Sequence, residues 1–140
     1  MDLYLVRHAA AFGRDPNRWP DDSRRPLTPE GEEEFRLAAR GLARIAPRTD
    51  AVLSSPYQRA WQTAEILSEL DSWPEPEPSP VLEPTIPPEK ATLTLEDYAD
   101  AKSVAVVGRS PRASRISSTN SATSAWRLAL GSISTSMRLR

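Results

Sequence analysis

Apolar residues gather in three short runs, each ending in a polar or charged group. The runs are Leu-Tyr-Leu-Val at 3–6, Ala-Val-Leu-Ser at 51–54 and Ser-Val-Ala-Val-Val-Gly at 103–108. Apolar residues occupy consecutive positions in these runs, which is typical of parallel strands covered by helices on both faces. The pattern therefore predicts three buried strands.

Between the first two strands, residues 11–26 read as a polar loop, and Thr28-Pro29-Glu30 then marks the start of a helix. Threonine is a good N-cap, and proline suits the first helical position. Residues at helical spacing predict a buried face made of Phe35, Ala38, Ala39, Leu42, Ile45 and Ala46. Pro47 should end this helix.

After the second strand, Ser55 and Gln58 have the spacing of a capping box, so a second helix should open there. Its expected buried face consists of Tyr57, Ala60, Trp61, Ala64 and Leu67. The helical pattern fades around Asp71.

Seven of the 14 prolines lie between Pro74 and Pro88, which predicts an extended connection without a helix. Thr94-Leu95-Glu96-Asp97-Tyr98 then has the pattern of a short capped helix. The order strand, helix, strand, helix, helix, strand indicates an α/β fold with a mainly parallel sheet.

Composition excludes several kinds of site. The 140 residues include no cysteine and one histidine, so disulfides, thiolate metal sites and histidine-rich metal sites are ruled out. No apolar run approaches the ~18 residues of a membrane span, and Met1-Asp2-Leu3 does not open a signal peptide. We expect one cytoplasmic domain that does not enter a membrane.

Charge is distributed unevenly along the chain. Residues 1–100 hold all 19 acidic residues and 11 basic ones, whereas residues 101–140 hold seven basic residues and no acidic one. A basic segment can bind nucleic acid. Here Trp126 is its only aromatic residue and no recognition motif is present, so no nucleic-acid partner is expected.

The three strands deliver chemically useful residues to one edge of the sheet. Arg7-His8 follows the first strand, Arg59 lies just beyond the second, and Arg109 follows the third. Ligands of parallel sheets bind at this edge. A neutral imidazole can attack phosphorus, and guanidinium groups bind phosphate oxygens. For Arg7-His8 alone, a solvated basic turn is the favoured interpretation, but the three ends together indicate a phosphate site.

Three segments carry a resemblance to a known family. They are Leu-Tyr-Leu-Val-Arg-His-Ala at 3–9, Arg-Pro-Leu-Thr-Pro-Glu-Gly at 25–31, and Val-Leu-Ser-Ser-Pro-Tyr-Gln-Arg-Ala-Trp-Gln-Thr-Ala at 52–64. In this order and spacing they resemble the histidine phosphatase superfamily, with its phosphoglycerate mutase-like fold. The small phosphohistidine phosphatases of the SixA type are the most similar group. Residues 104–108 are similar to the strand before that family's second histidine.

The resemblance implies a three-layer α/β fold and a set of residue roles. His8 would accept the phosphoryl group and lose it to water, while Arg7 and Arg59 would bind the phosphoryl oxygens. No metal or other cofactor is implied. Glu83 lies about where broader members keep an acidic proton donor, although a solvent-facing glutamate is the favoured alternative.

The chain departs from the family after its third strand. The family pattern would be Gly-His-Glu-Pro, whereas residues 108–111 read Gly-Arg-Ser-Pro. Arg109 could bind phosphate in place of the histidine but could not act as an acid. From 109 to 140 there are nine serines, six arginines and no acidic residue, a composition that a frame-shifted reading of GC-rich codons would produce. We expect a phosphatase domain over 1–108, an atypical tail over 109–140, and an incomplete or irregular C-terminal part of the fold.

These features favour one activity and leave two alternatives. The favoured activity is hydrolysis of phosphohistidine on a protein through a covalent intermediate on His8. The alternatives are a phosphomonoesterase acting on a small phosphate ester, and a catalytically impaired phosphate-binding module that lacks the second histidine. No long insertion forms a lid, which favours an open site and a protein substrate. We expect a monomer.

Overall fold

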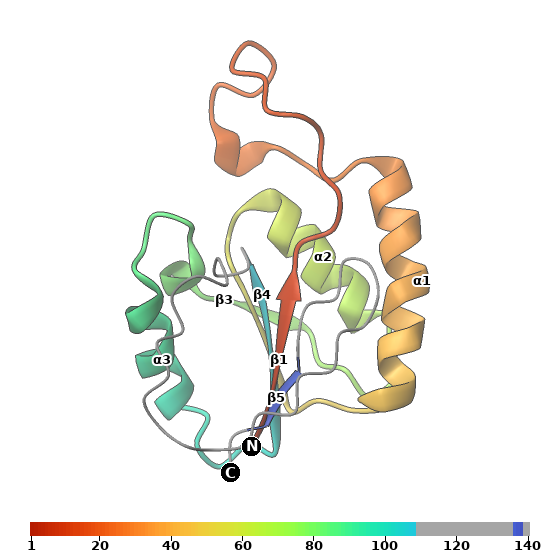
Figure 1. Cartoon of the computed structure of the whole chain (residues 1–140), viewed down its shortest axis with the longest axis vertical. Helices are drawn as coiled ribbons and strands as arrows, with labels where there is room; N and C mark the ends of the chain where they lie inside the picture. The colour runs from red at the N-terminus through yellow and green to blue at the C-terminus, as the bar shows by residue number, and fades with distance from the viewer. Residues whose placement is uncertain (109–135, 139–140) are drawn as a thin grey trace.

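The computed structural model describes residues 1–108 and 136–138, which form a five-stranded sheet with helices on both faces (Figure 1). The strand order is β3-β2-β4-β1-β5, and all neighbouring pairs are parallel except β1 and β5. The strands are β1 (Asp2–Arg7), β2 (Ala51–Ser54), β3 (Pro76–Pro78), β4 (Ser103–Gly108) and β5 (Ser136–Arg138). The helices are α1 (Pro29–Ile45), α2 (Gln58–Ser68) and α3 (Pro88–Glu96), with short 3-10 turns η1 (Asp22–Arg24) and η2 (Pro80–Leu82).

Two apolar layers hold the helices to the sheet. Helices α1 and α2 cover one face around Phe35, Leu67 and Trp73, and α3 covers the other face over a smaller cluster that includes Leu3 and Leu53. Burial of this apolar surface is the main force that holds the layers together. The three-layer α/β architecture with a mainly parallel sheet is therefore confirmed.

The main predicted elements lie where the sequence indicated. The runs at 51–54 and 103–108 coincide with β2 and β4, and β1 extends the predicted strand at 3–6 by one residue at each end. Helix α1 begins at Pro29, with the Thr28 hydroxyl accepting a hydrogen bond from the Gly31 amide at 3.0 Å. The start of α1 is thus set by its predicted cap.

The predicted buried face of α1 is wrong at one residue. Ile45 is 61% exposed, whereas Phe35, Ala39, Leu42 and Ala46 are buried. These four lie at spacings of four, three and four residues along one side of the helix, and Ile45 is turned away from that side.

The predicted capping box at Ser55 is also wrong, because α2 begins only at Gln58 with Tyr57 as its N-cap. The Ser55 amide donates to the Val107 carbonyl at 3.0 Å, which keeps Ser55 as an extension of β2. The buried face of α2 is rotated accordingly, and its members are Arg59, Ala60, Thr63, Ala64, Ile66 and Leu67.

The proline-rich connection contains structure that the sequence did not predict. Pro76–Pro78 forms the edge strand β3 alongside β2, and η2 follows it. Alternate residues of a strand direct their amides to opposite sides, so the two prolines lack donors only on the unpaired side of this edge. Helix α3 starts at Pro88, six residues before the predicted Thr94.

Beyond Gly108 the structure describes only β5, which lies antiparallel to β1 with Asp2 opposite Arg138. The expectation of an irregular C-terminal part did not include this strand. Arg109 and the segment 109–135 lie outside the described residues. Within the described part of the chain, no helix is long and apolar enough to cross a membrane.

Candidate active site

Hydrogen bonds fix His8 and Ala9, the first two residues after β1. The His8 amide donates to the Gly108 carbonyl at 3.2 Å, so the end of β4 fixes the end of β1. The Ala9 amide donates to the Thr63 hydroxyl at 3.0 Å, and that hydroxyl donates to the Arg59 carbonyl at 2.7 Å. Thr63 is fully buried, so one side chain of α2 joins the helix to the residue after His8.

The next two residues are held by the start of α1. The Ala10 carbonyl accepts from the Thr28 amide at 3.0 Å, and Ala11 forms a bridge with Leu27. A Cβ atom at Gly31 would overlap the Ala10 carbonyl oxygen, so this close approach requires glycine. Residues 8–11 are therefore fixed by β4, α1 and α2 together.

The imidazole of His8 is oriented by its own neighbour. Its Nδ1 lies 2.8 Å from the Ala9 carbonyl, an oxygen that can only accept, so Nδ1 carries the proton and Nε2 keeps its lone pair. Burial lowers the pKa of His8, and the positive charges of Arg59, Arg7 and Arg25 lower it further, whereas the hydrogen bond to Ala9 opposes them. The imidazole is therefore neutral at physiological pH and can act as a nucleophile at Nε2.

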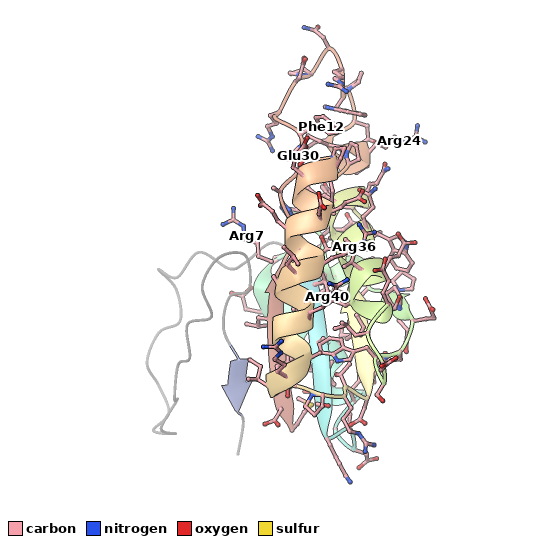
Figure 2. All side chains as sticks on the ribbon, turned by 90° about the vertical axis from the view of Figure 1, so that its right-hand side faces the viewer. Arg7, Phe12, Arg24, Glu30, Arg36 and Arg40 are labelled. Carbon is pink, nitrogen blue, oxygen red and sulfur yellow. The ribbon has the colours of Figure 1, made fainter. Side chains whose placement is uncertain are left out.

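An open pocket of about 440 Å³ lies beside His8, at the C-terminal end of β1. Its lining residues are Arg7, His8, Ala9, Ala10, Ala11 and Arg25. Arg7 is exposed, and its side chain projects away from α1 (Figure 2). Within the described part of the chain its guanidinium makes no hydrogen bond or ion pair, so one cation at the rim of the pocket faces solvent.

Two further cations near His8, Arg25 and Arg59, contact the same carboxylate, that of Asp22. Asp22 Oδ1 accepts from Arg25 Nε at 2.8 Å, and Asp22 Oδ2 lies 3.1 Å from Arg59 Nη2. The Arg59 side chain is only 7% exposed and that of Arg25 13%. Arg59 does not line the pocket, but after burial, the largest cause, its positive charge also lowers the pKa of His8.

The remaining predicted site residues are less clearly placed. Glu83 caps the end of η2, is half-buried and does not line the pocket. The carbonyl oxygen of the preceding Leu82 lies 3.6 Å from where a Cβ atom on Gly108 would be. Leu82 therefore lies close to the end of β4, and Glu83 is the next residue along the chain. Arg109 lies outside the described residues, and its role stays a prediction. The described residues contain no cluster of three or more acidic, histidine or cysteine side chains that could hold a metal ion.

Sequence reasoning did not single out Asp22, Arg25 or Thr63. Arg25 and Thr63 lie inside the segments 25–31 and 52–64 that carried the family resemblance, so their signal was present in the motifs. Asp22 lies in a polar loop, where nothing in the residue pattern separates it from Asp15 or Asp21.

Comparison with known proteins agrees with this geometry. Residues 3–82 match the family model of the histidine phosphatase superfamily (branch 1). This chain belongs to the histidine phosphatase superfamily. The match spans β1, η1, α1, β2, α2 and β3, and so every element that contributes a described residue to the pocket.

Within this superfamily the chain is similar to solved SixA structures. A structure of the protein histidine phosphatase SixA complexed with tungstate is 31% identical, with a TM-score of 0.69, over 79% of this chain and 70% of that one. A protein assigned as the phosphohistidine phosphatase SixA of Agrobacterium tumefaciens is 25% identical, with a TM-score of 0.68 and the same coverage. An uncharacterized protein of a Picosynechococcus strain is 39% identical over 55% of this chain, and the match spans 46% of that protein.

Proposed function

We propose that the chain is a phosphatase that removes the phosphoryl group from phosphohistidine on a protein, through a covalent intermediate on His8. The observation that carries the proposal is the hydrogen bond from His8 Nδ1 to the Ala9 carbonyl, which leaves Nε2 unprotonated beside three arginines. The similarity to SixA structures supports phosphohistidine as the substrate class.

The reaction would proceed in two displacements. In the first, the lone pair of His8 Nε2 forms a bond to phosphorus, and the bond between phosphorus and the substrate imidazole breaks with its electron pair on that imidazole, which takes up a proton from solvent. In the second, water attacks the phosphorus and releases a proton to solvent, the electron pair of the N–P bond returns to Nε2, and inorganic phosphate leaves. Each step places negative charge on the phosphoryl oxygens, which Arg7, Arg25 and Arg59 would stabilise.

The leaving group explains the choice of phosphohistidine over a phosphate ester. An imidazole leaves readily once protonated, whereas an alkoxide needs a proton from the protein. Among the described residues, the pocket lining contains arginine, alanine and the nucleophile itself, and none of these is a suitable acid. Glu83 would serve an ester substrate only if it reached the pocket.

The test compares phosphate release from a phosphohistidine-containing protein with release from p-nitrophenyl phosphate. Phosphohistidine is acid-labile and alkali-stable, and because His8 is the only histidine, any phosphohistidine identified on the chain must be this residue. His8→Asn retains a donor near Nδ1 and removes Nε2, so it should keep the fold and abolish both label and turnover. Label that persists in His8→Asn would contradict the covalent mechanism, and a preference for p-nitrophenyl phosphate would favour the phosphomonoesterase alternative.

A further inference from the structure

We propose that Asp22 is a positioning residue that fixes the guanidinium groups of Arg25 and Arg59 beside His8 and thereby strengthens oxyanion binding in the pocket. The inference rests on the proposed function, because it assigns Asp22 to the same site. It concerns a carboxylate, a group that would ordinarily repel phosphate.

The contacts of Asp22 fix two planar cations at once. Its carbonyl oxygen accepts from Arg59 Nη1 at 2.8 Å while its Oδ2 lies 3.1 Å from Arg59 Nη2. Two contacts on different nitrogens fix the plane of a guanidinium as well as its position. The other carboxylate oxygen, Oδ1, holds Arg25 Nε at 2.8 Å.

Asp22 is itself held in place by the turn to which it belongs. The Asp21 carboxylate accepts from the amide and hydroxyl of Ser23 at 3.0 and 2.6 Å, which caps η1. The hydrogen bond from Arg25 lowers the pKa of Asp22, and the charges of Arg59, Arg25 and Arg14 act in the same direction, against the effect of burial. Asp22 is therefore ionised at neutral pH and fixed before any ligand arrives.

Some N–H donors of the two guanidinium groups remain available to bind an oxyanion. A guanidinium carries five N–H donors. Arg59 directs two nitrogens to Asp22, and Arg25 directs Nε to Asp22 and Nη1 to the Phe12 carbonyl at 2.6 Å, which leaves its Nη2 for the pocket. Burial lowers the pKa of Arg59, the charge of Asp22 opposes this shift, and the charge of Arg25 lowers the pKa further, so the two cations repel each other. Without the carboxylate between them, the two guanidinium groups should move apart.

Positioning and simple electrostatics predict opposite results for phosphate binding. If Asp22 acted only as a nearby negative charge, its neutralisation would strengthen the binding of an anion. If Asp22 positions the two arginines, its neutralisation should weaken binding, because misplaced donors lose much of their effect. The sign of the change therefore separates the two roles.

The experiment measures the affinity of the full chain for inorganic phosphate by calorimetry, together with kcat and KM for phosphohistidine. We expect Asp22→Asn to weaken phosphate binding about 10-fold and to lower kcat/KM about 10- to 100-fold. Asp22→Glu keeps the charge but cannot match both contacts, and should also weaken binding. Asp21→Asn is the matched control, since it removes a neighbouring exposed charge that contacts neither arginine, while the asparagine amide oxygen can still accept from Ser23 and cap η1. It should change binding less than about twofold.

A double-mutant cycle with Arg59→Ala completes the test. If Asp22 acts through Arg59, the effect of Asp22→Asn should shrink by at least about threefold in the Arg59→Ala background. Unchanged or tighter phosphate binding in Asp22→Asn, or full additivity in the cycle, would overturn the proposal. A wild-type chain without phosphatase activity would contradict the proposed function, whereas the phosphate affinities would still decide the role of Asp22.

Discussion

The two sides of the His8 pocket differ in how far they are organised before a ligand binds. On the held side, the pocket is lined by residues 8–11 and Arg25, and Arg59 lies outside the lining. Hydrogen bonds with β4, α2, the start of α1 and Asp22 fix the main chain and both cations. On the open side, Arg7 is exposed at the end of β1. Its place follows from strand alternation, since Tyr4 and Val6 pack towards α1 and α2 whereas Leu3 and Leu5 belong to the opposite face.

The difference indicates whether an arginine side chain loses its conformational entropy on folding or on ligand binding. On the held side the fold has already restricted the guanidinium groups, so binding a phosphoryl group costs little further entropy. On the open side, an arginine loses up to about 2 kcal/mol of rotamer freedom when it becomes ordered. Two arginines with the same expected role should therefore contribute unequally.

The largest effect should come from Arg59→Ala. This change removes a fixed cation from the held side and should lower kcat/KM for phosphohistidine by about 30- to 1000-fold, or roughly 2–4 kcal/mol. Arg36→Ala is the matched control, because Arg36 pairs with Glu69 and Glu32 away from the pocket. Near wild-type efficiency in Arg59→Ala would contradict the comparison.

The main chain of the held side can be tested with two glycines of one helix. Gly31→Ala places a methyl group against the Ala10 carbonyl and should destabilise the fold by roughly 1–3 kcal/mol in urea unfolding. Gly41→Ala meets nothing within 4 Å and should stabilise it by up to about 1 kcal/mol through helix propensity. Equal effects of the two changes would show that residues 8–11 do not press against α1.

On the open side, Arg7→Ala should lower kcat/KM by only about tenfold, since part of the gain from binding is offset by ordering the side chain. Its contribution should also fade as the salt concentration rises from 0.05 to about 0.5 M, because exposed charges are screened more than buried ones. A loss equal to that of Arg59→Ala at all salt concentrations would remove the distinction between the two sides.

The smallest effect should appear in the pKa of His8, read from the single histidine signal in a proton NMR titration. Burial and the nearby arginines hold this pKa below the ordinary 6.5, so more than half of the imidazole is still neutral at pH 6.5. Removing a cation makes protonation easier and raises the pKa. Arg59→Ala should raise it more than Arg7→Ala, because the charge of Arg59 has the larger effect on His8.

The sequence predicted three of the five described strands and the start of α1, for local reasons. Consecutive apolar residues mark β2 and β4, and the Thr28-Pro29 pair marks the start of α1, because each signal depends on a few adjacent positions. Edge strand β3 was not predicted, because its pairing with β2 depends on residues distant in the sequence, whereas its prolines locally disfavour a strand.

The site shows the same division. His8 and Arg7 could be predicted because they end a buried strand, and Arg59 because it belongs to a recognisable motif. The contact between Asp22 and Arg59 joins residues 37 positions apart, and no local sequence pattern predicts it. The expected roles of His8, Arg7, Arg59, Arg109 and Glu83, and the division of the chain at residue 108, remain predictions.

The pairing of β1 with β4 also sets the order in which the site can form during synthesis. Asp2 lies opposite Ser103 and Arg7 opposite Gly108. Roughly 100 further residues must therefore be synthesised before β1 can pair with its parallel neighbour β4. Contacts between such distant residues form slowly, since a long loop must close first. The His8 amide can therefore reach the Gly108 carbonyl only late in folding, and in a nascent chain His8 is not held in place until β4 has emerged.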